Sequence, residues 1–239
     1  MKKISISVVS YANTLPFIQG IKNSSVMDLI ELSSDYPSEC ARRVINNEVD
    51  MGIIPVAALT KLSEYHIIGD YCIGSDGAVN SVFIYSQKPI EEISTLLLDI
   101  QSRTSNGLAR ILLKHYWKKD VQIVTEGPSD AFVLIGYRTF GQDNLAPYIY
   151  DLGHFWKEFT GLPFAYAVWV SNKKLPETFV KEFNLALAEG VSHATDVIGD
   201  INKVEGFDYV SYLTEYLDFN LTDGKREAID RYLSFYRDL

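Results

Sequence analysis

Hydrophobic residues alternate with polar ones at the start of the chain and then change to a helical spacing. Between Lys3 and Ser10, the apolar side chains of Ile4, Ile6 and Val8 occupy every second position, which is the period of a β-strand. From Leu15 to Ile21 the apolar residues recur with helical spacing. The pattern predicts a strand, a short polar turn and a helix.

The first third of the chain repeats this alternation. Further strands are expected at 27–32 and 51–56, each followed by a helix, at 37–47 and 57–64. Alternation of this kind is typical of parallel strands covered by helices. Two more strands, at 67–72 and 78–85, come directly after one another.

After a polar crossing at 87–92 the alternation restarts. The remaining expected strands are 95–100, 121–125, 131–135 and 164–170, and the remaining expected helices are 105–117, 152–160, 176–198, 209–217 and one that Thr222 caps. Two α/β units and a helical tail predict a two-lobed α/β fold, with a helix-covered, mostly parallel sheet in each lobe.

The expected lobes are discontinuous in sequence. Lobe 1 would contain residues 1–86 and 171–239, and lobe 2 would contain residues 87–170. The long strands at 78–85 and 164–170 would link the lobes, and the helical tail would pack back on lobe 1. In such a fold a ligand lies in the cleft, at the carboxyl ends of strands from both lobes.

Composition and charge narrow the possible partners. The chain has 239 residues and a formal net charge of -9, which argues against nucleic acid or an anionic membrane as the main partner. No apolar run approaches the roughly 18 residues of a membrane span, and the first strand leaves no room for a signal peptide. Cys40 and Cys72 lie far apart and form neither a disulfide framework nor a metal motif. We therefore expect a cytoplasmic monomer or homodimer without cofactor or metal.

Small polar side chains follow the first strand, in residues 10–14. They stand beside the N–H groups at a helix start that have no partner within the helix, a common place to hold an anion. Tyr11 and Asn13 are therefore candidate site residues. An equally good interpretation is that Asn13 or Thr14 caps the helix and that Pro16 sits in its first turn.

A second polar turn, at 99–107, follows an apolar strand and enters a helix. It contains Ser102, Arg103, Thr104 and Ser105. An arginine can bind a carboxylate through two parallel hydrogen bonds, and a helix N-terminus adds a favourable dipole. An acidic protein could hold a carboxylate in this way. The simpler alternative is a capping serine or threonine with a solvated arginine.

Three further strand ends can face the same cleft. Pro55 precedes a helix, where its main role is to fix φ. Asn80 and Ser81 point to opposite sides of the chain where the first linker begins, so one of them can face the cleft. Thr160 and Gly161 form a turn before the second linker that can present N–H groups to it.

The histidines and the common nucleotide motifs add nothing to this site. The four histidines, at positions 66, 115, 154 and 193, are dispersed, and none has metal-ligand spacing or a nucleophile partner. The chain contains no Walker loop, no GxGxxG and no GxSxG motif. Nucleotide-binding and serine-hydrolase functions are therefore disfavoured.

Taken together, these segments resemble the chorismate dehydratases of the futalosine route to menaquinone. The residues that carry the resemblance run in family order from about residue 4 to residue 171: Ser10-Tyr11-x-Asn13 with Pro16, Cys40-Ala41, Glu48 to Val56, Ser81-Val82 before Ser86, Ser102 to Ser105, Asp130-Ala131 before Ile135-Gly136, Tyr150 to Gly153 with Trp156, and Thr160 to Phe164 with Ala167 to Trp169. The resemblance implies a two-lobed fold like that of the type II periplasmic binding proteins.

It also implies a reaction, the loss of water from chorismate to give 3-[(1-carboxyvinyl)oxy]benzoate. Residues 102–105 would bind the carboxylates of chorismate, which has two. Because the matched segments contain no histidine, we hypothesise that the protein positions its substrate more than it titrates. Asn13 would orient the departing hydroxyl, Ser81 would hold a carboxylate, and the enolpyruvyl carboxylate of the substrate would take the proton.

Three departures from the family pattern leave alternatives open. Ala12 stands where leucine is usual, Asn47 where glycine is usual, and Tyr137 where aspartate is expected. The sister enzyme of the pathway, 1,4-dihydroxy-6-naphthoate synthase, is the nearest enzymatic alternative, but the segment 160–169 matches the dehydratases better. A non-catalytic binding protein or a ligand-sensing domain would share the fold, and Tyr137 keeps a binder of an aromatic acid possible.

Overall fold

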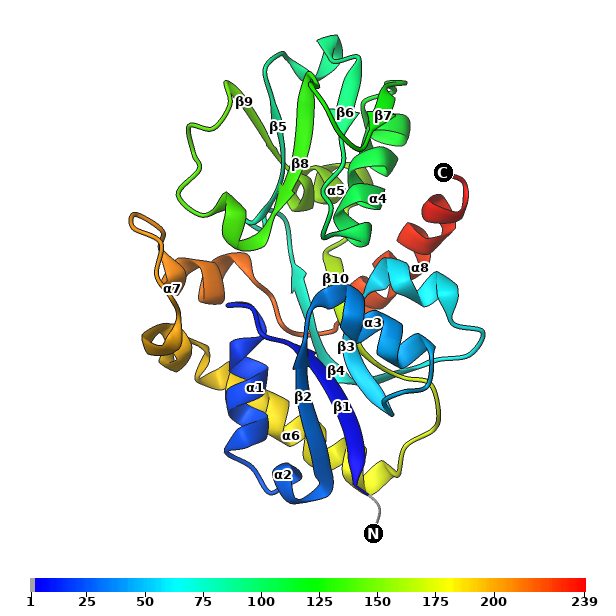
Figure 1. Ribbon diagram of the computed structural model, residues 1–239, viewed down its shortest axis with the longest axis vertical. Helices are drawn as coiled ribbons and strands as arrows, with labels where there is room; N and C mark the ends of the chain where they lie inside the picture. The colour runs from blue at the N-terminus through cyan, green and yellow to red at the C-terminus, as the bar shows by residue number, and fades with distance from the viewer. Residues whose placement is uncertain (1–2) are drawn as a thin grey trace.

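Two five-stranded sheets, one in each lobe, form the framework of the protein (Figure 1). The computed structural model describes residues 3–239. In strand order, the first sheet contains β2 (Ile30–Asp35), β1 (Ile4–Val9), β3 (Met51–Pro55), β10 (Phe164–Ser171) and β4 (His66–Ser75), and the second contains β7 (Gln122–Val124), β6 (Thr95–Leu97), β8 (Ala131–Ile135), β5 (Val82–Ser86) and β9 (Tyr148–Asp151).

The sheets are mostly parallel, as expected, but each is mixed because it contains one strand that runs against the others. In the first sheet β10 runs antiparallel to β3 and β4, and in the second β5 runs antiparallel to β8 and β9. The reason is that β5 and β10 each receive the chain directly from the other lobe. They therefore enter their sheets from the cleft, whereas their neighbours end there.

Both changes of lobe come one strand earlier in the chain than the expected boundaries after residues 86 and 170. β5 belongs to the second sheet and β10 to the first, so the crossings are the short segments 76–81 and 161–163. Gly77, Asn80 and Gly161 have φ values of +106°, +54° and +73°. Asparagine and glycine tolerate this left-handed backbone better than other residues, which allows the chain to turn sharply at both crossings.

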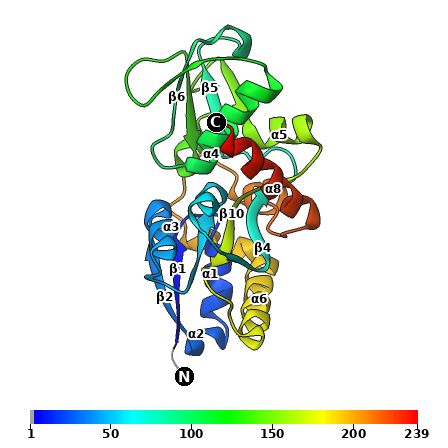
Figure 2. The same ribbon diagram turned by 90° about the vertical axis from the view of Figure 1, so that its right-hand side faces the viewer.

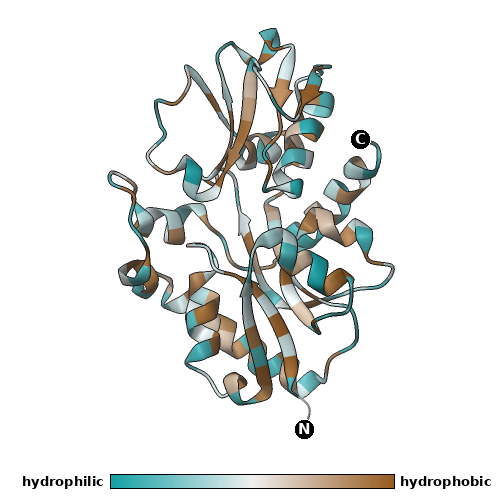
Figure 3. Ribbon diagram, in the orientation of Figure 1, coloured by the Kyte–Doolittle hydropathy of each residue, from teal (hydrophilic) through white to brown (hydrophobic). Residues whose placement is uncertain are grey.

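Helices cover the sheets and provide most of the remaining structure. The α-helices are α1 (Leu15–Lys22), α2 (Val26–Leu29), α3 (Pro37–Ile45), α4 (Arg103–Ile111), α5 (Leu152–Thr160), α6 (Glu177–Ser192), α7 (Tyr209–Ser211) and α8 (Asp223–Arg237). The tighter 3₁₀ turns are η1 (Val56–Lys61), η2 (Ile90–Glu92), η4 (Gly136–Thr139) and η5 (Ala194–Asp200), and the wider π turns are η3 (Leu112–Tyr116) and η6 (Tyr212–Tyr216). Figure 3 shows hydrophobic residues along the strands of both sheets, while the helices carry both hydrophobic and hydrophilic residues.

Most expected elements are confirmed, with local differences. The strand expected at 27–32 begins only at Ile30, because 26–29 form the helical turn α2. The expected helix at 57–64 is the 3₁₀ turn η1, and the helices at 105–117 and 209–217 end in π turns. β9 was not expected from the sequence.

The helix that follows the first polar turn is held by backbone contact. A Cβ atom at Gly20 of α1 would lie 2.1 Å from the carbonyl oxygen of Ala186, and one at Gly190 would lie 2.0 Å from the carbonyl oxygen of Pro16. α1 and α6 therefore touch along their backbones. The ring of Phe17 in α1 also packs edge-on against that of Trp169, with the ring centroids 5.9 Å apart. This packing fixes where the turn at residues 10–14 points.

The last helix joins the two lobes, whereas the sequence predicted a tail on lobe 1 alone. Thr222 caps α8 as expected, with its Oγ1 accepting from the N–H of Lys225 at 3.3 Å. The hydroxyl of Tyr232 donates to the carbonyl of Thr104 in α4 at 3.0 Å. Figure 2 shows α8 running from the first lobe to the side of α4. Among residues 3–239, no helix combines the length and the apolar character needed to cross a membrane.

Candidate functional site

A cavity of about 120 Å³ lies in the cleft between the lobes, at strand ends from both sheets. Seven of the predicted site residues line it: Tyr11, Asn13, Pro55, Ser81, Ser102, Thr104 and Ser105. We call this space the inner cavity. The structure thus brings together four segments that are separated in sequence.

The first turn is fixed by Thr14, which leaves Asn13 available to the cavity. The Thr14 Oγ1 accepts from the N–H of Tyr11 at 3.0 Å and donates to the carbonyl oxygens of Val9 and Tyr11. Thr14 occupies the cap position of α1, but its side chain makes no capping hydrogen bond. Pro16 lies in the first turn of the helix, as the sequence predicts.

The second turn divides its residues between the cavity and the surface. The Ser102 Oγ caps α4 by accepting from the N–H of Ser105 at 3.1 Å, and its hydroxyl donates to the Ser105 Oγ at 2.9 Å. The Thr104 Oγ1 accepts from the N–H of Ala57 at 3.1 Å, which ties the two lobes together. Arg103 is exposed and lines a neighbouring cavity of about 350 Å³, which shares Ser102 and Pro55 with the inner cavity but does not include Asn13. Ser102 is thus a capping serine and Arg103 a solvent-exposed arginine, as the simpler alternative has it, but Ser102, Thr104 and Ser105 also line the inner cavity.

The first linker directs Ser81, and not Asn80, into the inner cavity. The Asp151 carboxylate accepts from the N–H groups of Val79 at 3.0 Å and Asn80 at 2.8 Å, and it also caps α5. Burial raises the pKa of the Asp151 carboxyl, and these N–H donors oppose the rise. The carbonyl of Ser81 accepts from the N–H of Gly136 at 2.7 Å. Ser81 is thus held on both sides by the second lobe.

The turn at the end of α5 lies outside the inner cavity. The Thr160 hydroxyl donates to the carbonyl of Trp156 at 2.8 Å, and its Oγ1 accepts from the N–H of Leu162 at 3.1 Å. Gly161 ends α5 in the left-handed conformation. Both residues shape the second crossing between the lobes.

Two tyrosines of the site were not foreseen. The hydroxyl of Tyr212, in the helical tail, donates to the Ser81 Oγ at 3.3 Å. Burial raises the pKa of Tyr212 to about 12, and hydrogen bonds with Ser81 and Asn13 oppose this rise. Tyr166 lines the inner cavity, and burial raises its pKa well above the usual value. Period-2 alternation in β10 could have indicated Tyr166, but no local signal marks Tyr212.

The lining of the inner cavity carries no charge near neutral pH. Among the described residues, it contains no Asp, Glu, His, Lys or Arg side chain. The hydroxyls of Tyr166 in this lining and of Tyr212 beside it keep their protons because burial disfavours their ionised forms. The site can therefore donate hydrogen bonds and orient a ligand, but it offers no side chain that readily takes up a proton.

A larger cavity of about 540 Å³ adjoins the inner one. We call it the outer cavity. The two share Tyr11, Asn13 and Gln101 in their linings, and the outer cavity adds Arg138. It also adds Tyr137, whose side chain is half exposed and whose hydroxyl donates to the carbonyl of Asn202. The tyrosine that replaces the expected aspartate thus ties the second lobe to the tail.

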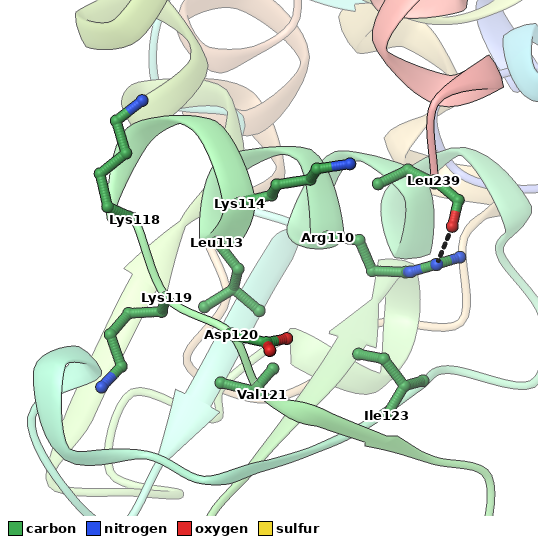
Figure 4. A pocket seen from close by; sticks show the side chains of 9 residues that line it. All are labelled: Arg110, Leu113, Lys114, Lys118, Lys119, Asp120, Val121, Ile123 and Leu239. Atoms are coloured by element: carbon green, nitrogen blue, oxygen red, sulfur yellow. Dashed lines mark hydrogen bonds between the residues drawn. The ribbon is translucent and has the colours of Figure 1, made fainter.

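A fourth cavity, of about 560 Å³, lies away from the strand ends (Figure 4). The carbonyl of Leu239 at its edge accepts from Arg110 at 2.9 Å, and the Lys119 Nζ donates to the carbonyl of Glu91 at 2.6 Å. The side chains of Lys118 and Lys119 point away from one another in Figure 4. Because a bound anion needs donors that converge, we do not assign a site there.

The part of the chain that the structure describes contains no candidate metal site and no disulfide. Residues 3–239 contain no group of three His, Cys, Asp or Glu residues placed to hold a metal ion. Cys40 and Cys72 are free and buried, and burial raises their thiol pKa values to about 11 and about 12. Buried protonated thiols of this kind are unreactive.

Comparison with known proteins agrees with this architecture. A family model described as menaquinone biosynthesis matches residues 4–238. A chorismate dehydratase from Thermus thermophilus is 22% identical over 227 residues, which cover 82% of this chain and 81% of the relative. A solved structure from Archaeoglobus fulgidus has a TM-score of 0.74 at 16% identity and covers 99% of this chain and 97% of its own.

A Candida albicans protein, described as having the generic periplasmic binding protein fold, has a TM-score of 0.62. It is 12% identical to this chain, and the match covers 100% of this chain and 91% of that protein. The expected two-lobed fold of the periplasmic-binding-protein type is thereby confirmed.

Proposed function

The chain belongs to the menaquinone biosynthesis family, and on that basis we propose that it is a chorismate dehydratase. The reaction would remove water from chorismate and give 3-[(1-carboxyvinyl)oxy]benzoate. One observation carries the proposal. Asn13 and Ser81, from two different turns, meet the hydroxyl of Tyr212 in a cleft whose inner lining is uncharged near neutral pH.

The chemistry asks for positioning more than for a strong acid or base. A proton leaves the ring carbon that bears the ether, and its electron pair forms a new ring double bond. The C–O bond of the neighbouring hydroxyl breaks, and that hydroxide leaves as water with the proton that the enolpyruvyl carboxylate took from the ring. Because the ring becomes aromatic, the elimination is strongly driven once the reacting atoms are aligned. Alignment of this kind can supply a large part of a rate enhancement.

Five polar side chains in and beside the inner cavity have roles in this proposal. The Asn13 amide donates to the departing hydroxyl and stabilises the charge that develops on it. Ser81 and the hydroxyls of Ser102 and Ser105 hold the enolpyruvyl carboxylate. Since these donors are neutral, the carboxylate stays basic enough to take the ring proton. Tyr212 fixes the orientations of Ser81 and Asn13.

The Thermus thermophilus relative that carries the name chorismate dehydratase supports the same assignment. Both cysteines are free thiols, which fits a cytoplasmic enzyme. The sister reaction of the pathway, which makes 1,4-dihydroxy-6-naphthoate, is the enzymatic alternative.

A non-catalytic binding protein for an aromatic carboxylate is the second candidate, because Tyr137 stands in the outer lining where the family pattern has aspartate. Purified protein incubated with chorismate distinguishes these functions. Appearance of 3-[(1-carboxyvinyl)oxy]benzoate, detected by mass spectrometry, supports the dehydratase. Binding of chorismate with no product after many hours supports the binding protein.

A further inference from the structure

The inner cavity is too small to hold a ring with two carboxylates by itself. Sites for small organic ligands usually have volumes of about 300–1,000 Å³, and the inner cavity has about 120 Å³. The adjoining outer cavity adds about 540 Å³ and shares Tyr11 and Asn13 with it. A substrate held at Asn13 therefore extends into the outer cavity.

Arg138 is the cationic residue of that outer lining. It lies in η4, immediately after β8, two residues beyond the glycine whose N–H binds the carbonyl of Ser81. Its Nη2 donates to Oδ2 of Asp99 at 2.5 Å, and the Asp99 side chain is 0% exposed while that of Arg138 is 37% exposed. The arginine is thus anchored from behind and presents its remaining surface to the cavity.

Asp99 is itself held in place at the end of β6. Its N–H donates to Oδ1 of Asn106 at 2.9 Å, and its carbonyl accepts from Nδ2 of Asn106 at 2.7 Å. Its Oδ1 accepts from the N–H of Gln101 at 2.7 Å. The structure gives the guanidinium of Arg138 no acceptor other than Asp99 within residues 3–239. Donors therefore remain on a guanidinium whose direction is fixed.

We propose that Arg138 binds the ring carboxylate of the substrate, as a second anion subsite opposite the hydroxyls of the inner cavity. This inference rests on the proposed function and names the residue that selects a dicarboxylate. A planar guanidinium matches a carboxylate through two parallel hydrogen bonds. The exposed Arg103, which the sequence suggested for this task, lines the cavity of about 350 Å³, which shares Ser102 with the inner cavity but does not reach Asn13.

The two carboxylates of chorismate need different partners. The carboxylate that takes the ring proton must stay basic, and a guanidinium would lower its pKa. Neutral hydroxyl donors of the inner cavity suit that group, so the arginine suits the ring carboxylate, which takes no part in proton transfer. Arg138 also acts on Tyr11 between the two cavities: burial raises the pKa of Tyr11, and the charge of Arg138 opposes this rise. Asp200 lines the outer cavity too, but it is exposed and water screens its charge.

Titration calorimetry with three stable probes tests this subsite. The probes are 3-(carboxymethoxy)benzoate, which has both carboxylates, phenoxyacetate, which lacks the ring carboxylate, and 3-methoxybenzoate, which lacks the other. Arg138→Gln should weaken binding of the first and third probes by about 10- to 100-fold. Phenoxyacetate should bind the variant within about twofold of the wild type.

A matched control is Arg226→Gln, which removes an arginine of similar exposure, 39%, on α8 from its ion pair with Asp70 of β4. It should change none of the three affinities. The double variant Asp99→Asn with Arg138→Gln leaves no buried carboxylate unpaired, and it should show the same loss if the single variant is unstable. Unchanged binding of 3-(carboxymethoxy)benzoate, or equal losses for all three probes, would overturn the subsite.

The proposed reaction and the subsite can fail separately. If the wild type does not consume chorismate but Arg138→Gln loses only the probes with a ring carboxylate, the subsite stands and the reaction falls. If the wild type converts chorismate and Arg138→Gln leaves KM unchanged, the reaction stands and the subsite falls.

Discussion

The hydroxyl of Tyr212 donates a hydrogen bond to the Oγ of Ser81 at 3.3 Å, although the two residues lie 131 positions apart. Tyr212 belongs to the helical tail, and Ser81 belongs to the first crossing between the lobes. Close by, Phe207 of the tail stacks on Phe140 of the second lobe with ring centroids 3.7 Å apart. The tail is therefore part of the site, and it closes one side of the cleft.

Removal of the Tyr212 hydroxyl should slow the reaction without unfolding the protein. In Tyr212→Phe the ring still fills its buried position, but Ser81 and Asn13 lose a common partner. We expect kcat to fall about tenfold, because a misoriented donor costs on the order of 1–2 kcal/mol in the transition state.

Steady-state rates with chorismate measure this change, and Tyr116→Phe is the control because its hydroxyl binds Glu158 outside the cleft. A Tyr212→Phe enzyme with wild-type kcat would show that the tail does not orient the site.

The pH dependence of kcat should be flat between about pH 6 and pH 9. Burial raises the pKa of Tyr212 to about 12 and that of Tyr166 well above its usual value, so both hydroxyls remain protonated donors throughout this range and lose their protons only above it. No other group of the inner lining titrates near neutral pH. A pH–rate profile at saturating chorismate measures this. A step near pH 6.5 would instead indicate a histidine base.

Gly20→Ala should destabilise the fold strongly. The new methyl group would lie 2.1 Å from the carbonyl oxygen of Ala186, and neither helix backbone can move without separating α1 from α6. Overpacking against backbone should cost about 3 kcal/mol of the free energy of unfolding, measured by urea denaturation. Gly199→Ala is the control, since nothing lies within 4 Å of a Cβ there, and its unfolding free energy should change by less than about 0.5 kcal/mol.

Asp151→Ala should loosen the first crossing. The Asp151 carboxylate accepts from N–H groups at both Asn80 and Gly153, so its loss leaves several donors unpaired and removes the cap of α5. We expect a loss of about 3 kcal/mol in the free energy of unfolding. Because Ser81 follows this crossing, kcat should fall as well. Asp208→Ala, which removes the exposed cap of α7, should cost about 1 kcal/mol and serves as the comparison. Equal losses in the two variants would contradict the special role of Asp151.

The sequence predicted those parts of the site that are built from local structure. The turn carrying Asn13 follows an alternating strand and the turn carrying Ser102 follows an apolar one, and both turns precede helices, so their placement at strand ends follows from short-range patterns. The sequence suggested that Arg103 binds a carboxylate together with the hydroxyls of Ser102 and Ser105. A residue at the start of a helix can equally face solvent, however, and its direction depends on packing that sequence spacing does not encode.

Long-range contacts account for what the sequence did not predict. Tyr212 reaches the cleft because the tail folds across both lobes, and Arg138 faces the outer cavity because Asp99, 39 residues earlier, anchors it. β5 and β10 exchange lobes through pairings with distant strands. Tyr137, which departs from the family pattern, lies at a strand end that does face the outer cavity. No sequence motif marked its neighbour Arg138 as a site residue.

The kcat of Asn13→Ala, measured at saturating chorismate beside that of the wild type, tests the central claim most directly. If Asn13 stabilises the departing hydroxyl, loss of its amide should lower kcat by about 100- to 1,000-fold and leave KM within about threefold, because the carboxylates are held elsewhere. An Asn13→Ala protein that forms 3-[(1-carboxyvinyl)oxy]benzoate at the wild-type rate would contradict the mechanism.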